Sequence, residues 1–168
     1  MAKTRGAATP ALAVLDAASV AYRVREYAHD PRSTAFGTEA VEKLGLPAEA
    51  VFKTLLVDVG TSTVTAVVPV GRQLDLKALA SAVGAKGAQL LDPDVAQRVT
   101  GYVVGGISPL GQRRRHACVV DESALGLSTV YVSGGRRGLS IGLAPADLVK
   151  AADADVAPIA RQSSTADR

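Results

Sequence analysis

Lys53 is the residue whose type and position most strongly suggest chemistry, because it interrupts the run VFKTLLV at residues 51–57. The other residues of this run are β-branched, aromatic or aliphatic, which favours a β-strand. A lysine in such a strand either points to water or holds its ammonium in a cleft, where it can bind an anion or polarise a carbonyl. Lysine side chains are mostly exposed, so the run by itself favours the first interpretation.

The segment GGISPLG at residues 105–111 is the second candidate, because three glycines and a proline fix a backbone path that side chains do not dominate. Such a loop can bring main-chain N–H groups close to a ligand carbonyl or oxyanion. An ordinary connection between strands explains the same composition equally well. The residues alone leave both interpretations open.

Two basic clusters follow glycine-containing turns: Arg113, Arg114 and Arg115 form one, and Arg136 and Arg137 form the other. Together with Lys53 they could face one polyanion, although a single charge run is usually a solvated rim. The formal net charge is +3 and the pI is about 9.2, which permits a polyanionic partner without requiring one. Because only 4% of the residues are aromatic, extended base stacking is not expected.

Cys118 is the single cysteine and lies in the apolar run ACVV, which predicts a buried, unreactive thiol rather than a nucleophile. The other candidate metal ligands are His29 and His116, and no pair of these three residues has the spacing of a structural zinc site. No G-x-S-x-G motif marks a nucleophilic serine. The sequence therefore predicts no metal, no cofactor and no protein nucleophile.

The elements that must position these residues alternate irregularly, which predicts a mixed α/β or α+β domain rather than regular βαβ winding. A loop is expected at 33–37, and a GTS turn at 60–62 joins two strands as a hairpin. Helices are expected at 10–18, 38–44, 76–83, 93–98 and 144–152, with a helical turn at 47–50. Strands are expected at 22–27, 51–59, 63–70, 102–104, 117–120, 129–133 and 139–143.

The 168 residues fit one domain, and 48% hydrophobic residues supply one ordinary core. We expect a flexible N-terminus at 1–8, the domain at 9–160 and a disordered tail at 161–168. The single cysteine, the lack of a signal peptide and the lack of a long apolar run favour a cytoplasmic protein without membrane contact.

The sequence resembles the YbaK/EbsC family, and specifically the bacterial Cys-tRNA(Pro) deacylases. The resemblance covers about residues 9–160, and the long run GYVVGGISPLGQ is its most specific part. The matching stretches are YAHDP (27–31), VFKTLLV (51–57), QLDLKALA (73–80), DPDVAQRVTGYVVGGISPLGQRRR (92–115) and YVSGGRRGL (131–139). The resemblance implies a free-standing relative of the editing domain of prolyl-tRNA synthetases, with a mixed sheet that curls into a partly open barrel flanked by helices.

The activity that the resemblance implies is deacylation of mischarged Cys-tRNA(Pro), with Cys-tRNA(Cys) as a further substrate. The substrate thiol would attack its own ester, which makes the step formally that of a lyase. Aminoacylated tRNA is the implied partner, and prolyl-tRNA synthetase a possible second one. Two alternatives stay open: hydrolytic editing of another mischarged tRNA such as Ala-tRNA(Pro), and a nucleic-acid-binding regulator without catalysis.

The resemblance also implies roles for individual residues, with Lys53 as the catalytic residue. One departure concerns Ser140 and Gly142, which stand where many relatives carry acidic residues, so this protein either lacks a carboxylate that would hold the substrate's amino group or uses another residue for it. The implied substrate-binding residues are Tyr27, Phe36, Thr54, Gly105, Gly106, Ile107, Ser108, Pro109 and Ser140. The implied tRNA contacts are Arg113, Arg114, Arg115, Arg136 and Arg137.

Overall fold

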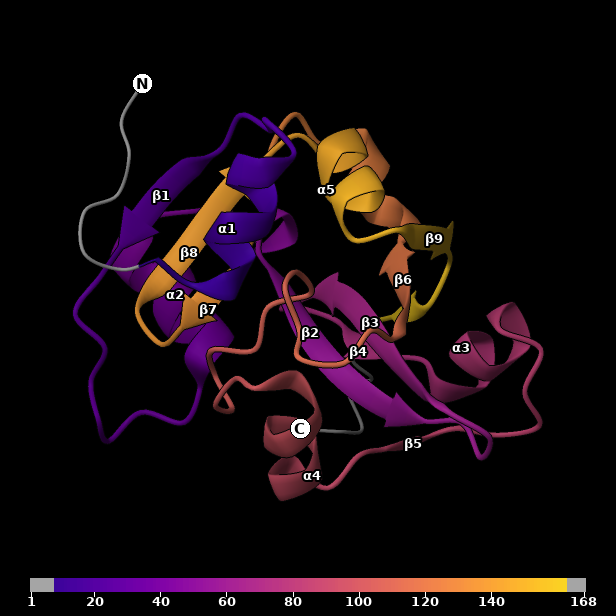
Figure 1. Ribbon diagram of the computed structural model, residues 1–168. Helices are drawn as coiled ribbons and strands as arrows, with labels where there is room; N and C mark the ends of the chain where they lie inside the picture. The colour runs from indigo at the N-terminus through magenta and orange to yellow at the C-terminus, as the bar shows by residue number, and fades with distance from the viewer. Residues whose placement is uncertain (1–7, 163–168) are drawn as a thin grey trace.

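The computed structural model describes residues 8–162 as a mixed α/β arrangement (Figure 1). The expected flexible N-terminus (1–8) and disordered tail (161–168) lie almost wholly outside the described residues. The exception at the C-terminal side is Arg161, which pairs with Gln73 in a short two-stranded ladder. Arg161 therefore belongs to a strand and not to a disordered segment.

Within the described residues there are five α-helices and ten strands. The helices are α1 (Pro10–Ala17), α2 (Phe36–Leu44), α3 (Leu76–Ala82), α4 (Pro93–Thr100) and α5 (Pro145–Ala151), with 3-10 turns at Ala48–Ala50 and Glu122–Gly126. The strands are β1 (Arg23–Glu26), β2 (Phe52–Asp58), β3 (Thr63–Pro69), β4 (Gln73–Leu74), β5 (Gln89–Leu90), β6 (Ala117–Asp121), β7 (Val130–Arg136), β8 (Leu139–Leu143), β9 (Ala154–Ala157) and β10 (Ala160–Arg161).

Two larger sheets organise the chain, and neither closes into a barrel. The first has the order β5-β2-β3-β6-β9; β2 and β3 form the predicted antiparallel hairpin, whereas β3, β6 and β9 run parallel. The second is antiparallel with the order β1-β8-β7. A single parallel bridge between Val51 and Tyr131 joins the two sheets at the start of β2, which confirms the predicted mixed architecture.

The helix starts follow local rules that are readable in the sequence. Thr9, Asp75 and Asp92 cap α1, α3 and α4 by accepting a hydrogen bond from a backbone N–H of the first turn. Proline in the first turn of α1, α4 and α5 fits the same rules. The helix α2 begins at Phe36, two residues earlier than expected, so the expected loop at 33–37 is shorter.

Other local predictions were wrong where distant contacts decide. Residues 102–104 form no strand: the Tyr102 hydroxyl donates to the Leu110 carbonyl, and the Val104 N–H donates to Gln97 Oε1. Strand β7 continues to Arg136, with an irregular register after Ser133, so the hairpin turn is tighter than predicted. The sequence also missed β4, β5, β9 and β10, whose short segments carry little β-forming character.

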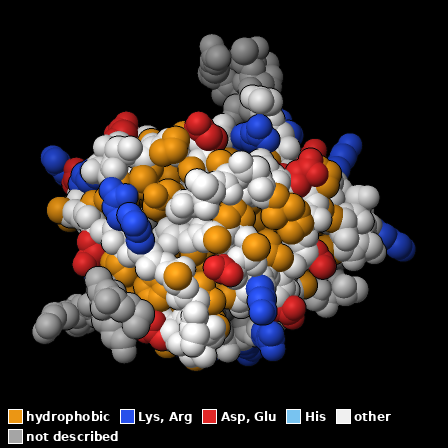
Figure 2. Space-filling model, turned by 90° about the horizontal axis from the view of Figure 1, so that it is seen from above, with side chains coloured by type: hydrophobic (Ala, Val, Ile, Leu, Met, Phe, Trp, Pro, Cys, Tyr) orange, Lys and Arg blue, Asp and Glu red, His pale blue; other side chains and the backbone are white. Residues whose placement is uncertain are grey.

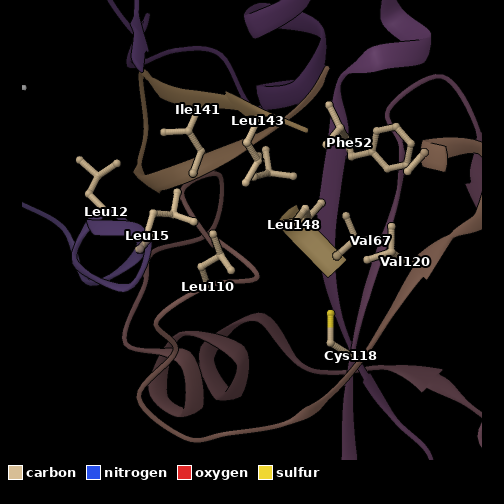
Figure 3. Close-up of a cluster of buried hydrophobic side chains, with 14 of the residues drawn as sticks. Leu12, Leu15, Phe52, Val67, Leu110, Cys118, Val120, Ile141, Leu143 and Leu148 are labelled. Carbon is tan, nitrogen blue, oxygen red and sulfur yellow. The ribbon is translucent and has the colours of Figure 1, made fainter. Parts of the chain in front are cut away.

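Apolar side chains pack on both faces of the larger sheet. On one face, α1 and α5 cover a cluster that includes Phe52, Val67, Ile141 and Leu148, and Figure 3 shows the Cys118 sulfur directed into it. The opposite face packs a second cluster under α3, which includes Val57, Val64, Leu79 and Ile159. Full burial of each such apolar side chain contributes about 1.5–3 kcal/mol to the stability of the fold. Because β2 supplies residues to both clusters, its position between the two layers is fixed.

Candidate active site

A cavity of about 500 Å³ lies along β2 where the two sheets diverge. Its walls come from the segment before α2, from α2 itself, from β2, from the start of α4, from the loop after α4 and from β7 and β8. Seven of the expected site residues line it: Tyr27, Phe36, Lys53, Thr54, Gly105, Ile107 and Ser140. Segments that are distant in the chain thus meet at one place.

The edge of β2 that faces the cavity is unpaired over most of its length. At this edge the Leu91 N–H donates to the Leu56 carbonyl at 2.9 Å. Because alternate residues of a strand direct their polar backbone groups to the same edge, Thr54 presents its N–H and C=O there too. Within residues 8–162 no strand pairs with 52–56 at this edge, between the bridge at Val51 and the pairing of Val57.

Lys53 is the one charged side chain among the described residues that line the cavity. Its side chain is about half-buried, and burial lowers the pKa of its ammonium from the usual 10.5. Among residues 8–162, no carboxylate lies within ion-pairing distance of it. The cavity therefore holds an uncompensated positive charge, which favours anions and polarised carbonyls.

Phe36 and Tyr27 form part of the wall beside the lysine. A methyl group built on Gly105 would come within 2.5 Å of the Phe36 ring, so only glycine permits this close approach. The His29 ring lies 5.7 Å from the Phe36 ring, centroid to centroid. The Tyr27 N–H donates to the Gly138 carbonyl, and burial together with nearby Glu39 raises the pKa of the Tyr27 hydroxyl.

Glu39 anchors the segment that carries Tyr27 and Phe36, and the sequence analysis missed it. This carboxylate, 5% exposed, accepts from the Asp30 N–H at 2.8 Å and lies 2.6 Å from His29 Nδ1 and 3.2 Å from Lys43 Nζ. Burial acts to raise the pKa of Glu39, but the hydrogen bonds outweigh it and bring the pKa down to about 2. Glutamate is mostly exposed in proteins, so no local signal marked the burial of Glu39.

The glycine-rich loop reaches the cavity only in part. Gly105 and Ile107 line it, whereas Gly106, Ser108 and Pro109 are buried behind the wall. The Gly106 N–H is already bonded to the Val103 carbonyl at 2.8 Å, and the Ser108 hydroxyl accepts from the Leu110 N–H. The expectation that these three residues contact a ligand directly is therefore not supported by their position.

Three of the hydroxyl groups in the cavity wall belong to Ser140, Thr54 and Ser133. Ser140 on β8 is 6% exposed and lies opposite Ser133 of β7, which also lines the cavity. The Thr54 hydroxyl is buried and has no hydrogen-bond partner within the described part of the chain. Gly142 does not line the cavity: a methyl group there would come within 2.6 Å of the Tyr131 ring, so a carboxylate does not fit without rearrangement.

The two basic clusters differ in their surroundings. Arg113, Arg114 and Arg115 are exposed, and Arg115 lies 3.6 Å from Asp153 in a solvated pair. Arg136 is paired with Glu26, whereas Arg137 lies over the Phe36 ring beside the cavity. Figure 2 shows separate basic and acidic side chains among apolar patches on one face of the molecule, without a continuous basic surface there.

Cys118 is buried with 4% exposure, as predicted, and lies outside the cavity wall. Burial, with a smaller effect of Asp155, raises the pKa of its thiol to about 12. The neighbouring His116 is occupied with Gln112, whose Oε1 lies 2.8 Å from Nδ1. The buried position and the raised pKa of Cys118 thus argue against a nucleophilic role for its thiol.

Two further observations concern the described part of the chain. Among residues 8–162, no three His, Cys, Asp or Glu side chains gather as a candidate metal-ion cluster. In the same residues, no helix has both the length and the apolar character required to span a membrane.

Comparison with known proteins gives concordant matches. The family model described as an aminoacyl-tRNA editing domain matches residues 29–151. A protein of Enterococcus faecalis (strain ATCC 700802 / V583), EbsC, which is named as a proposed Cys-tRNA(Pro)/Cys-tRNA(Cys) deacylase, is 35% identical over 153 residues, or 90% of this chain and 92% of the relative.

Solved structures share the fold. The crystal structure of hypothetical protein APE2540 superposes with a TM-score of 0.81 at 26% identity, covering 91% of this chain and all of that one. The crystal structure of a proposed trans-editing enzyme for prolyl tRNA synthetase gives a TM-score of 0.79 at 23% identity, covering 93% of this chain and 99% of the other. The second match, at its low identity, supports the fold alone.

Proposed function

This chain belongs to the aminoacyl-tRNA editing domain family, and from that premise we propose that it removes cysteine from mischarged Cys-tRNA(Pro). The family activity is deacylation, in which the ester between the amino acid and the terminal ribose of tRNA is cleaved. Residues 9–160 are proposed to form the editing domain. The cysteine substrate is supported by the name of the Enterococcus faecalis relative.

The single observation that carries the proposal is Lys53, an ammonium in the wall of the cavity that has no carboxylate partner among residues 8–162. Ester cleavage builds negative charge on the carbonyl oxygen and on the leaving ribose oxygen. A fixed positive charge in a water-poor site stabilises such charge more than it stabilises the neutral ester. The unpaired backbone N–H of Thr54, on the same strand, is a further donor for either oxygen.

The cavity wall contains no histidine, cysteine or carboxylate to act as a base or an activated nucleophile among the described residues. This composition favours attack by the substrate's own thiol. Its sulfur bonds to the carbonyl carbon, the ester C–O bond breaks, and the ribose oxygen leaves with the proton. A small thiolactone ring is released and later opens in water.

The contribution of the protein is then to hold the ester in a reactive conformation beside Lys53. Ser140 and Ser133 lie on the opposite wall, where neutral hydroxyls take the place of the carboxylate expected from the resemblance. These hydroxyls are proposed to contact the amino acid. Selection of the tRNA by prolyl-tRNA synthetase in a joint complex is proposed as well, because the chain itself has few clustered basic residues.

The deciding experiment compares Cys-tRNA(Pro), Cys-tRNA(Cys), Ala-tRNA(Pro) and Ser-tRNA(Pro) in single-turnover deacylation. Cysteine esters should be cleaved fastest, and the serine ester much more slowly because a hydroxyl is a poorer nucleophile than a thiol. If alanine and serine esters are cleaved as fast as cysteine esters, water is the nucleophile and the chain is a hydrolytic editor. If no ester is cleaved, a binding role without catalysis replaces the proposal.

A further inference from the structure

We propose that Arg137 is a preorganised phosphate-binding residue at the mouth of the cavity, and that the neighbouring Arg136 is not. The ligand group is the 5′-phosphate of the terminal adenosine of the tRNA. The inference rests on the proposed function for the identity of the substrate. The sequence alone does not distinguish Arg136 from Arg137, whereas this proposal gives the two arginines different roles.

Arg136 already has a carboxylate partner within the protein. Its Nη2 lies 2.8 Å from Glu26 Oε2, in a surface ion pair whose side chains are 41% and 54% exposed. In addition, the backbone of Arg136 packs against Gly106, where an added methyl group would come within 2.7 Å of its Cα. A phosphate that approached Arg136 would have to compete with a carboxylate that is already in place.

Arg137 has the opposite setting. It is exposed, and among residues 8–162 no carboxylate lies within 4 Å of its guanidinium. Two contacts nevertheless fix its orientation: the guanidinium carbon lies 4.9 Å from the centroid of the Phe36 ring, and Nε donates to the Val104 carbonyl at 2.8 Å. A charged side chain that is both held and unneutralised is prepared to bind an anion with little loss of entropy.

The contacts of Arg137 also locate it relative to the cavity. Phe36 and Val104 both line the cavity, so the guanidinium lies at its mouth between two wall segments. The turn that follows is fixed, because Gly138 has φ +83° and lies against the Tyr27 carbonyl, where no other residue fits. The position of Arg137 is therefore determined by the same segments that form the cavity wall.

A phosphodiester is the anion that fits this position. With Nε occupied, the two terminal nitrogens of Arg137 remain as a planar pair of donors, which matches two oxygens of one phosphate. The reacting ester belongs beside Lys53, and the nearest anionic group of the substrate outside the terminal ribose is its 5′-phosphate. Because the guanidinium covers one face of Phe36, stacking of a base on that face is hindered.

The test compares adenosine 5′-monophosphate with adenosine, because the two ligands differ only in the phosphate. Dissociation constants are measured by ligand-observed NMR titration, which needs no turnover. For the unaltered protein, the nucleotide should bind more tightly than the nucleoside. In Arg137→Gln the nucleotide should bind about tenfold more weakly and the nucleoside within twofold of normal, whereas Arg136→Gln, the matched control, should change neither by more than twofold.

The same variants predict a difference with free tRNA. The slope of log affinity against log salt should become shallower by about 0.7 in Arg137→Gln, the value for one contact to a single-stranded phosphate, and should stay unchanged in Arg136→Gln. Arg137→Lys keeps the charge but loses the planar fork, so part of the nucleotide affinity should return. Thermal unfolding of each variant checks that the turn is intact.

Three results would overturn the assignment. They are equal binding of nucleotide and nucleoside by the unaltered protein, equal losses for both ligands in Arg137→Gln, and a larger loss in Arg136→Gln than in Arg137→Gln. Failure of the proposed function would be seen separately, in the deacylation assay. A protein that cleaves no ester would still give measurable dissociation constants for both ligands.

Discussion

Glu39 should contribute more to stability than the other charged residues of α2. Its replacement tests the hydrogen-bond network around the cavity wall. Glu39→Gln keeps the shape and one acceptor oxygen, which can still receive the Asp30 N–H. The second oxygen becomes an NH₂ group that faces His29 Nδ1, whose N–H the carboxylate Oε1 accepted at 2.6 Å. Glu42→Gln is the matched control, because Glu42 is an exposed residue of the same helix.

The expected size follows from the burial and partners of Glu39. A hydrogen bond to a charged group contributes about 1.5–3 kcal/mol, and a buried donor left unpaired costs about 1–3 kcal/mol. The contact with Lys43 adds little, because that side chain is 38% exposed and the pair is screened. We therefore expect Glu39→Gln to lower the free energy of unfolding by about 2 kcal/mol, and Glu39→Ala by about 3–4 kcal/mol, in urea denaturation at pH 7.

The pH dependence has a definite sign. The pKa of Glu39 lies at about 2 in the folded protein, below the ordinary value of 4.5, because the hydrogen bonds outweigh burial. The unfolded chain therefore binds the proton first as the pH falls. The stability contribution is complete above about 4.5 and is lost as the pH falls toward 2, so the difference between the unaltered protein and Glu39→Gln should shrink across that interval.

The result that would refute this reasoning is a Glu39→Gln protein that is no less stable than Glu42→Gln at pH 7. A stability difference that stays constant from pH 6 to pH 3 would refute the assignment of the effect to the carboxylate charge. His29 Nδ1, the Asp30 N–H and Lys43 Nζ contact the carboxylate oxygens of Glu39, so His29→Gln serves as a second variant that removes one of these contacts. Hydrogen exchange of the Asp30 amide gives a local readout.

Three further predictions concern the cavity and the core. Lys53→Ala should fold normally but lose deacylation by about a hundredfold or more, and Lys53→Arg should not restore it because a guanidinium differs in shape and donor geometry; near-normal turnover would contradict a catalytic Lys53. Cys118→Ala should keep most activity at a cost of about 1 kcal/mol in stability, and iodoacetamide should label Cys118 only after unfolding; rapid labelling of the folded protein would contradict its burial and raised pKa. Gly106→Ala should cost about 1–3 kcal/mol, since the new methyl group meets the Arg136 backbone, whereas Gly71→Ala has open space around it and should be nearly neutral in the same denaturation assay.

Much of the local architecture was predictable because its causes are local. Thr9, Asp75 and Asp92 cap helices at the positions that the sequence indicates, and the hairpin of β2 and β3 follows from two β-forming runs around a short turn. The placement of Lys53 in a cavity was expected from the resemblance, not from the run VFKTLLV, which by itself favours exposure. The inward position of Cys118 also followed from its apolar neighbours.

By itself, then, the sequence determined the capped helices, the hairpins, the mixed fold class and the residues around which a site could form. The tertiary structure decided which of those residues meet. Thr9 bonds to a carbonyl 125 residues away, and Arg136 pairs with a carboxylate 110 residues away, whereas Arg137 has no carboxylate partner among residues 8–162. The buried Glu39 and the missing strand at 102–104 have the same origin. Each depends on partners that only the packed chain brings within reach, and the free energy of such contacts outweighs the propensity of a short segment.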